Sequence, residues 1–387
     1  MSTKKKIFFF LIIINYQLLI INSAFGQDSS RLRISLLTCT PGDELYSTFG
    51  HSAFRVVDSN SVTDIVYNYG TFNFDDDGFY LKFARGKLLY FVSAEYFQDF
   101  KELYRSTNRG ITEQVLNVTA AQKINIQHFL NENLKEQNKY YKYDFFLDNC
   151  TTRLRDILKK NHDSSFAKIA VMPVGTTFRQ AIYQYLDKND KQWSKLGIDI
   201  LLGQPCDGKM TTEQMQFLPD NLMKALDSAG SNILLSRQAL YPFNEEQHNK
   251  SLFSPLVVFS LLLVVIGLIS LSKNIYAERF LQSFDGLLFF FTGLLGIILI
   301  FMWFFTDHSM TKNNYNLLWA WPMHIIAAFF VNSNKNWVKK YFAFTSVALV
   351  LVLLSWFFLR QHLNIALVPF VLLLIYRSAI KVFFEGK

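Results

Sequence analysis

Cysteine is scarce in this chain of 387 residues, which contains three. Cys39, Cys150 and Cys206 are too few for a disulfide scaffold, and an odd number leaves at least one unpaired. If any pair forms, Cys39 with Cys206 would leave Cys150 free, although the sequence does not show that pairing. Paired-cysteine metal spacing, a His-Glu-x-x-His pattern and a glycine-rich phosphate loop are also missing. We therefore predict no metal site and no cofactor.

A basic surplus is missing from the part of the chain that would meet a polyanion. The net charge is +8, but residues 27–250 carry 26 lysines and arginines against 27 aspartates and glutamates. The surplus lies in residues 1–26 and 251–387, which are the most apolar parts of the chain. Nucleic-acid binding needs clustered positive charge on the binding domain. We therefore expect no nucleic-acid partner.

The chain begins with the pattern of a secretory signal. Lysines at positions 4–6 precede an apolar run over residues 7–21. Ala24 and Gly26 in "NSAFGQ" then supply the small residues of a cleavage site. We predict a signal peptide at 1–26 and Gln27 as the mature N-terminus. An uncleaved anchor is the alternative, and it leaves the following domain on the same side of the membrane.

Hydropathy divides the rest of the chain near residue 250. Residues 27–250 are mixed in character and are predicted to form an exported, periplasmic domain. Residues 251–387 contain five apolar stretches, each near the roughly 20 residues that cross a bilayer, at 253–271, 284–305, 315–331, 341–359 and 363–380. Five spans place the C-terminus in the cytoplasm, and lysines and arginines concentrate in the predicted inner loops and tail. These patterns predict a protein of the inner (cytoplasmic) membrane.

The exported domain mixes strand and helix patterns. The segments "ISLLTC", "HSAFRVVD" and "DIVYNYGTFNF" favour strands because they are rich in alternating apolar, β-branched and aromatic residues. Apolar spacing predicts a helix over 96–106, and Thr119 is a plausible N-cap for a second helix. The periodicity of "DDDGFYLKFARGKLLYFVSA" does not decide between helix and strand. The class predicted is α+β.

Two residues of this domain are candidates for chemistry. Asp148 and Asn149 are cap-type residues, so Cys150 falls in the first turn of a helix. Free backbone N–H groups and the helix dipole stabilise a thiolate there, and the same amides can form an oxyanion hole. His51 lies on the second predicted strand. Taken singly, Cys150 can equally be a small buried apolar residue, and a lone strand histidine is more often a core residue.

A strand histidine, a polar residue on the next strand and "NC" opening a helix occur here in the order of circularly permuted papain-like folds. The order resembles the lecithin:retinol acyltransferase superfamily and its bacterial murein-amidase relatives. The resemblance implies that Cys150 is the nucleophile, His51 the base and Asn68 the residue that orients the imidazole. Tyr67 and Asp58 are the alternatives for that third role, because the superfamily often has a second histidine that this chain lacks.

A longer set of segments is more specific. "TCTPGDELYSTFGHSAFRV", "VYNYGTFNF", "YDFFLDNCTTRLRD" and "GIDILLGQPCDGKMTTEQMQFLPDNL", followed by a five-span tail, resemble a bacterial lipoprotein N-acyltransferase family. The resemblance implies a permuted papain-like thiol enzyme domain followed by an all-α membrane domain of five helices. It also implies a fatty acyl group passing through a Cys thioester from a membrane phospholipid to the N-terminal amine of a diacylglyceryl-cysteine lipoprotein.

Eight further residues are candidates for substrate binding beside the catalytic set. Each also has a plainer interpretation, as a turn residue, a helix cap, a paired surface arginine or part of a polar interfacial loop. They are Tyr46, Ser47, Tyr67, Asn149, Thr151, Arg153, His308 and Asn314.

Two rival functions use the same residues differently. A membrane-anchored thiol peptidase or amidase would cut cell-wall peptides with the same dyad, but a soluble wall substrate does not require five spans. A non-catalytic membrane receptor or assembly factor would not need Cys150 at all. We rank acyl transfer first, with a phospholipid donor, a lipoprotein acceptor and the membrane as partners.

Overall fold

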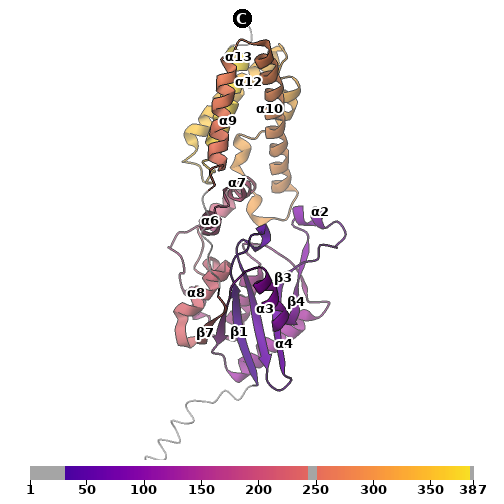
Figure 1. Cartoon of the computed structure of the whole chain (residues 1–387), viewed down its shortest axis with the longest axis vertical. Coiled ribbons are helices and arrows are strands. Elements are labelled where there is room, and N and C mark those ends of the chain that lie inside the picture. The colour runs from indigo at the N-terminus through magenta and orange to yellow at the C-terminus, as the bar shows by residue number, and fades with distance from the viewer. Residues whose placement is uncertain (1–30, 243–250, 384–387) are drawn as a thin grey trace, which may run out of the picture.

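The computed structural model describes residues 31–242 and 251–383 (Figure 1). The signal peptide predicted at 1–26 lies outside the described residues. A part built on a β-sheet and a part built of long helices stack along the longest axis of the molecule. The α+β class and a helical C-terminal part are therefore confirmed.

One antiparallel sheet of seven strands organises the N-terminal part, in the order β6-β4-β3-β2-β1-β5-β7. Its strands include the three segments predicted from alternation, and Cys39 at the end of β1 pairs with His51 at the start of β2. The bounds are β1 (Leu32–Cys39), β2 (His51–Asp58), β3 (Thr63–Thr71), β4 (Leu89–Tyr96), β5 (Ile111–Leu116), β6 (Tyr140–Lys142) and β7 (Leu234–Tyr241).

Both faces of the sheet centre are covered, as adjacent residues of β1 show. Leu36 belongs to a core with α4 (Ala120–Leu134), α5 (Cys150–Asn161) and α8 (Pro219–Ala229), while Leu37 packs with α3 (Phe97–Ser106). Successive side chains of a strand point to opposite faces of the sheet, so these two leucines lie on opposite faces. Neither is exposed, because helices cover both faces. The sheet therefore holds its polar site residues between two apolar layers.

The segment whose periodicity was ambiguous contains both kinds of structure, namely α2 (Phe79–Ala84) followed by β4. Between the sheet part and the long helices lie α6 (Phe178–Lys188) and α7 (Gln192–Leu201). Short 3-10 helices connect these elements: η1 (Leu45–Ser47), η2 (Ser164–Lys168), η3 (Gln204–Asp207), η4 (Gln214–Phe217), η5 (Gly230–Asn232), η6 (Ser309–Thr311) and η7 (Tyr315–Leu318).

The C-terminal part contains α9 (Pro255–Ser270), α10 (Ile275–Phe304), α11 (Met323–Phe329), α12 (Asn336–Ser355) and α13 (Leu367–Phe383). By length and composition, α10 and α12 are the two described helices that can cross a membrane, and α9 is a shorter apolar helix. Five equivalent spans are thus not confirmed. The predicted third span, 315–331, instead forms η7 and the seven-residue α11, which packs against α10.

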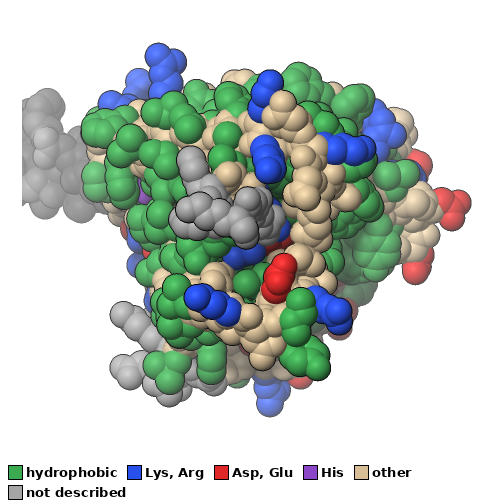
Figure 2. Space-filling view, turned by 90° about the horizontal axis from the view of Figure 1, so that it is seen from above, with side chains coloured by type: hydrophobic (Ala, Val, Ile, Leu, Met, Phe, Trp, Pro, Cys, Tyr) green, Lys and Arg blue, Asp and Glu red, His purple; other side chains and the backbone are tan. Residues whose placement is uncertain are grey.

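Charge inside the long helices is paired. Asp285 of α10 accepts hydrogen bonds from Arg377 of α13 at 2.6 and 2.8 Å and lies 3.0 Å from the Lys381 ammonium. All three side chains are at most 2% exposed. Seen from the end of the molecule farthest from the sheet, the surface is largely hydrophobic, with lysines and arginines more frequent than acidic residues (Figure 2).

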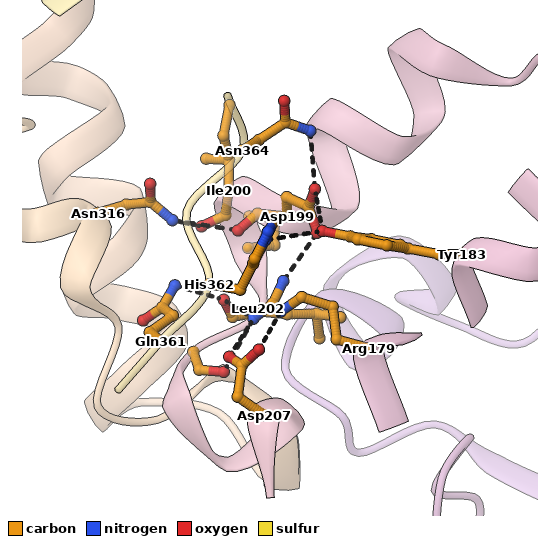
Figure 3. A network of polar contacts seen from close by, with 12 residues as sticks. Arg179, Tyr183, Asp199, Ile200, Leu202, Asp207, Asn316, Gln361, His362 and Asn364 are labelled. Atoms are coloured by element: carbon orange, nitrogen blue, oxygen red, sulfur yellow. Dashed lines mark hydrogen bonds and ion pairs between the residues drawn. The ribbon is translucent and has the colours of Figure 1, made fainter. Parts of the chain in front are cut away.

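A polar network joins the two parts (Figure 3). Arg179 of α6 donates to Asp199 of α7 at 2.8 Å and to Asp207 at 2.9 Å. The second Asp199 oxygen accepts from Asn364 of the helical part at 2.8 Å, and Gln361 donates to a carbonyl beside α7 at 3.0 Å. Because these partners are buried or half-buried, the junction is a fixed contact between the two parts.

Candidate active site

The helix that begins at Cys150 is fixed by its cap. The Asn149 side chain accepts from the Thr152 backbone N–H at 2.8 Å, and the Thr152 hydroxyl accepts from the Asn149 N–H at 2.8 Å. This reciprocal capping box sets the first turn of α5. The prediction that Cys150 lies in the first turn of a helix is confirmed.

His51 and Cys150 are in hydrogen-bond contact, although 98 residues separate them in the chain. Two glycines allow this approach. Gly50 has a φ of +79°, and a Cβ there would lie 2.6 Å from the Cys39 carbonyl oxygen. Gly70 has a φ of +91°, which disfavours a side chain, and it borders the dyad, because a Cβ there would be in van der Waals contact with the Cβ of Cys150 at 3.8 Å. Both positions require a residue without a side chain.

Burial is the largest single influence on the pKa values of the pair, and the charges and hydrogen bonds around it together outweigh burial. Burial disfavours both charged forms, but the imidazolium and the thiolate stabilise each other. The pKa of Cys150 is consequently lowered from 9.0, with help from hydrogen bonds from the Ser52 backbone and the Thr151 hydroxyl. The pKa of His51 is raised from 6.5. The arrangement makes proton transfer from the Cys150 thiol to the His51 imidazole easier than between the same side chains in water.

Asn68 on β3 forms a hydrogen bond with the second nitrogen of the His51 imidazole. Its Nδ2 donates to Glu95 Oε1 at 2.6 Å, which turns its Oδ1 towards His51. His51 Nε2–H therefore donates to that oxygen at 3.1 Å, and Nδ1 is the nitrogen left to face the sulfur.

The two alternatives for this third position point elsewhere. The Tyr67 hydroxyl donates to Asn131 at 2.8 Å on the opposite face of β3. Asp58 lies at the far end of β2 and accepts from Arg31 at 3.1 Å. Asn68 is thus the one of the three candidates that contacts His51.

Glu95 on β4 extends the chain of contacts to a fourth residue, which sequence reasoning missed. Burial raises its pKa, the Asn68 hydrogen bond opposes the rise, and the nearby Asp99 adds to it. The sequence contains no signal for Glu95, because it lies between the segment whose periodicity does not decide its structure, residues 75–94, and the helix predicted from residue 96. Its role depends on the pairing of β3 with β4, in which Asn68 lies opposite Ser93.

Two family models match the chain, and no curated protein or solved structure matches it significantly. The Lnb N-terminal periplasmic domain matches residues 26–185, and the Lnb transmembrane domain matches residues 247–387. The chain belongs to the Lnb family of lipoprotein N-acyltransferases. An Lnb protein is a membrane protein with a periplasmic N-terminal domain. The permuted papain-like topology stays a prediction.

The remaining candidates on this Lnb domain surround Cys150 in different ways. Thr151 lies next to the dyad, with its hydroxyl 3.1 Å from that of Ser52 and 3.8 Å from the Cys150 sulfur. The Asn149 amide donates to the carbonyls of Phe145 and Phe217 at 2.7 and 2.9 Å. Asn149 therefore ties the start of α5 to the loop before it and to the end of η4.

Three other candidates have their main contacts with residues other than His51 and Cys150, or are exposed. Arg153 forms a two-point ion pair with Asp148 at 2.7 Å and lies over the ring of Tyr141. The Ser47 hydroxyl donates to a backbone carbonyl within its own turn at 3.0 Å. Tyr46 is 72% exposed and free to meet a ligand.

Two candidates come from the helical part. His308 hydrogen-bonds to the Phe83 carbonyl at the end of α2, at 3.2 Å. The Asn314 amide is buried and donates to the carbonyls of Ile200 and Leu201 at 2.8 and 3.1 Å. Both side chains join the loop after α10 to the periplasmic domain.

All three cysteines are buried and unpaired, so the conditional disulfide between Cys39 and Cys206 is not formed. Burial raises the pKa of each of those two thiols to about 12, whereas that of Cys150 is lowered. Among the described residues, no cluster of three potential metal ligands exists. The one activated thiol of the three is Cys150.

Proposed function

We propose that this Lnb protein transfers a fatty acyl group from a membrane phospholipid to the amino terminus of a diacylglyceryl-cysteine lipoprotein through a thioester on Cys150. The observation that carries the proposal is the contact of Cys150, His51 and Asn68. Family membership supports a lipoprotein-processing acyltransferase, and the dyad supplies the nucleophile.

In the first step, the Cys150 thiolate attacks the ester carbonyl of the donor. The ester C–O bond breaks, and the His51 imidazolium gives its proton to the departing alkoxide, which leaves as a lysophospholipid. Backbone N–H groups at the start of α5 support a developing oxyanion. The product is an acyl thioester on the enzyme and a neutral imidazole.

In the second step, the free amine of the lipoprotein attacks the thioester carbonyl. The C–S bond breaks to regenerate the thiolate, an amide forms, and His51 takes the proton that the amine loses. Asn68 holds the imidazole ring in one orientation through both steps.

The location of the dyad supports a membrane-bound substrate. His51 is the first residue of β2, at the end of the sheet where β3 ends and the chain continues to α2. The segment after α2 contacts the helical part, because the Arg85 carbonyl accepts a hydrogen bond from the Asp307 backbone N–H at 2.9 Å. Anchoring the site at a membrane raises the effective concentration of lipid donor and acceptor. We propose that α13 ends on the cytoplasmic side of the inner membrane.

The test is mass spectrometry of lipoprotein N-termini in cells that carry the wild-type gene or Cys150→Ala. We expect N-acylated termini with wild type and free amines with the variant. A donor-only incubation of the purified protein should add one acyl mass to the peptide containing Cys150. Unchanged termini together with cleavage of wall peptides would establish the thiol amidase instead.

A further inference from the structure

The α2 cleft is an open cavity of about 630 Å³ beside α2. Aromatic rings form much of its wall, and basic side chains lie at its rim. Its lining includes Phe72, Asp76, Lys82, Lys87, Phe91 and Tyr140. None of these residues belongs to the dyad or to the residues singled out by the sequence.

The position of the cleft matches the level of lipid headgroups. The long apolar helix α10 ends at Phe304. Three residues later, the backbone N–H of Asp307 donates a hydrogen bond to the carbonyl of Arg85, the residue that follows α2. Phe304 is 65% exposed, and on α2 Tyr80 and Phe83 are 82% and 52% exposed. Exposed aromatic residues next to the end of a membrane helix are typical of the membrane–water interface.

The charge of the cleft favours an anion. Lys82 pairs with Asp76 at 2.6 Å, and Lys142 pairs with Asp307 at 3.0 Å. Arg85 and Lys87 also help to lower the pKa of Asp307. The lining of the cleft thus has two cationic side chains, Lys82 and Lys87, against one carboxylate, Asp76. The exposed Lys87 has no hydrogen bond or ion pair with another side chain among the described residues.

Aromatic contacts connect the cleft to the sulfur. The ring of Phe72 lies 5.3 Å from that of Tyr90, which stacks on Tyr143 at 4.4 Å. Tyr143 and Cys150 both border Gly70. An apolar wall therefore leads from the cationic rim towards the nucleophile.

We propose that the α2 cleft binds the phosphate of the glycerophospholipid donor, with Lys87 as the main cation and Lys82 beside it. The inference rests on the proposed acyl transfer and names the residues that hold its donor. A lipid phosphate is anionic and lies at the depth of the cleft, and its acyl ester can extend along the aromatic wall.

The first experiment measures acyl transfer by the full chain in lipid nanodiscs, with varied mole fraction of phosphatidylethanolamine and a diacylglyceryl-cysteine peptide as acceptor. Lys87→Gln should raise the KM for the phospholipid about five- to tenfold and leave kcat and the KM for the acceptor unchanged. Asp76→Asn, which releases Lys82, should lower the donor KM. The control Lys224→Gln alters an exposed lysine of α8 and should change nothing.

The second experiment does not depend on activity. A phosphatidylethanolamine with a photoreactive headgroup is cross-linked to Cys150→Ala, and we expect the label within residues 72–91 and its loss in Cys150→Ala with Lys87→Glu. Equal competition by soluble glycerol phosphate would overturn a lipid-specific site. If Lys87→Gln transfers acyl groups with an unaltered KM for the donor, the proposed phosphate subsite is overturned and the proposed function is not. If the cross-link is specific but the wild-type protein transfers no acyl group, the proposed function is overturned and the subsite is not.

Discussion

This protein contains two polar networks with different roles, one reactive and one structural. One runs from Cys150 through His51 and Asn68 to Glu95, at the end of the sheet nearest α2. The other surrounds Arg179 at the junction between the sheet part and the long helices. Both are largely buried, and both link elements that are distant in sequence.

They differ in how completely their groups are satisfied. Arg179 donates to two carboxylates and to the carbonyls of Leu202 and Gly203, so its hydrogens have fixed partners. In the reactive network each link is a single hydrogen bond, and the pKa values of His51 and Cys150 move towards each other. A proton can shift between Cys150 and His51 in the reactive network, whereas the network around Arg179 holds the two parts of the molecule in place.

The largest expected effect is on the reactive network. His51→Ala removes the base and the charge that stabilises the thiolate, so we expect acyl transfer to fall about 10²- to 10⁴-fold. Stability should change little, because His51 is only half-buried. Single-turnover kinetics of Cys150 acylation, beside a thermal melt of the same sample, checks both statements, and a rate within twofold of wild type would remove His51 from the mechanism.

At the junction the effect should be on stability. Asp199→Ala leaves the buried Arg179 with one carboxylate and takes acceptors from Tyr183 and Asn364. Breaking one partner of a buried ion pair costs about 3–5 kcal/mol. We expect a loss of that size in denaturant unfolding of the detergent-solubilised protein.

Asp187→Ala is the matched control for this variant. Asp187 pairs with Lys195 at 2.7 Å on the surface, where its side chain is 49% exposed. An exposed pair contributes about 0–1 kcal/mol. Equal losses in the two variants would contradict the distinction between a fixed junction and a solvated surface pair.

The local features of the reactive network were predictable, but their assembly was not. Alternation identified β1, β2 and β3, and the cap residues placed Cys150 at a helix start, because strand period and capping act over a few residues. The contact of Asn68 with Glu95 depends on the pairing of two strands separated by α2. A single sequence does not specify that register.

The helical part shows the same limit. Composition predicted a third span at 315–331 because the segment is apolar. In the structure Asn316 donates to the carbonyls of Asp199 and Ile200 at 3.1 and 3.2 Å, and Pro322 has no N–H to give to a helix. Because of these tertiary contacts, the first part of the predicted span forms the 3-10 helix η7, and only the seven residues of α11 are α-helical.

A smaller effect should follow from the outer end of the reactive network. Glu95→Gln presents an amide to the Asn68 amide and allows the pair to reorient, so that His51 loses its fixed acceptor. We expect kcat to fall about tenfold, equivalent to 1.4 kcal/mol, with the KM for both substrates unchanged. Asp99→Asn, at an exposed neighbour, is the control, and a change in KM without a change in kcat would contradict a positioning role.

The smallest expected effect is a shift in the pH dependence of activity in Asn68→Ala. The Asn68 hydrogen bond raises the pKa of His51, so losing it should lower that pKa. The imidazolium is lost as the pH rises through the pKa of His51. The variant, in which that pKa is lower, should therefore lose activity at a lower pH on the alkaline side. The profile of kcat/KM and the ultraviolet absorbance of the thiolate measure this shift.

Asn131→Ala removes the acceptor of the Tyr67 hydroxyl on the opposite face of β3 and serves as the control for that profile. It should leave both limbs in place. If Asn68→Ala slows transfer but does not move the alkaline limb, Asn68 orients the imidazole without stabilising its charge. The raised pKa would then come from the sulfur alone, and the reactive network would end at His51 instead of reaching Glu95.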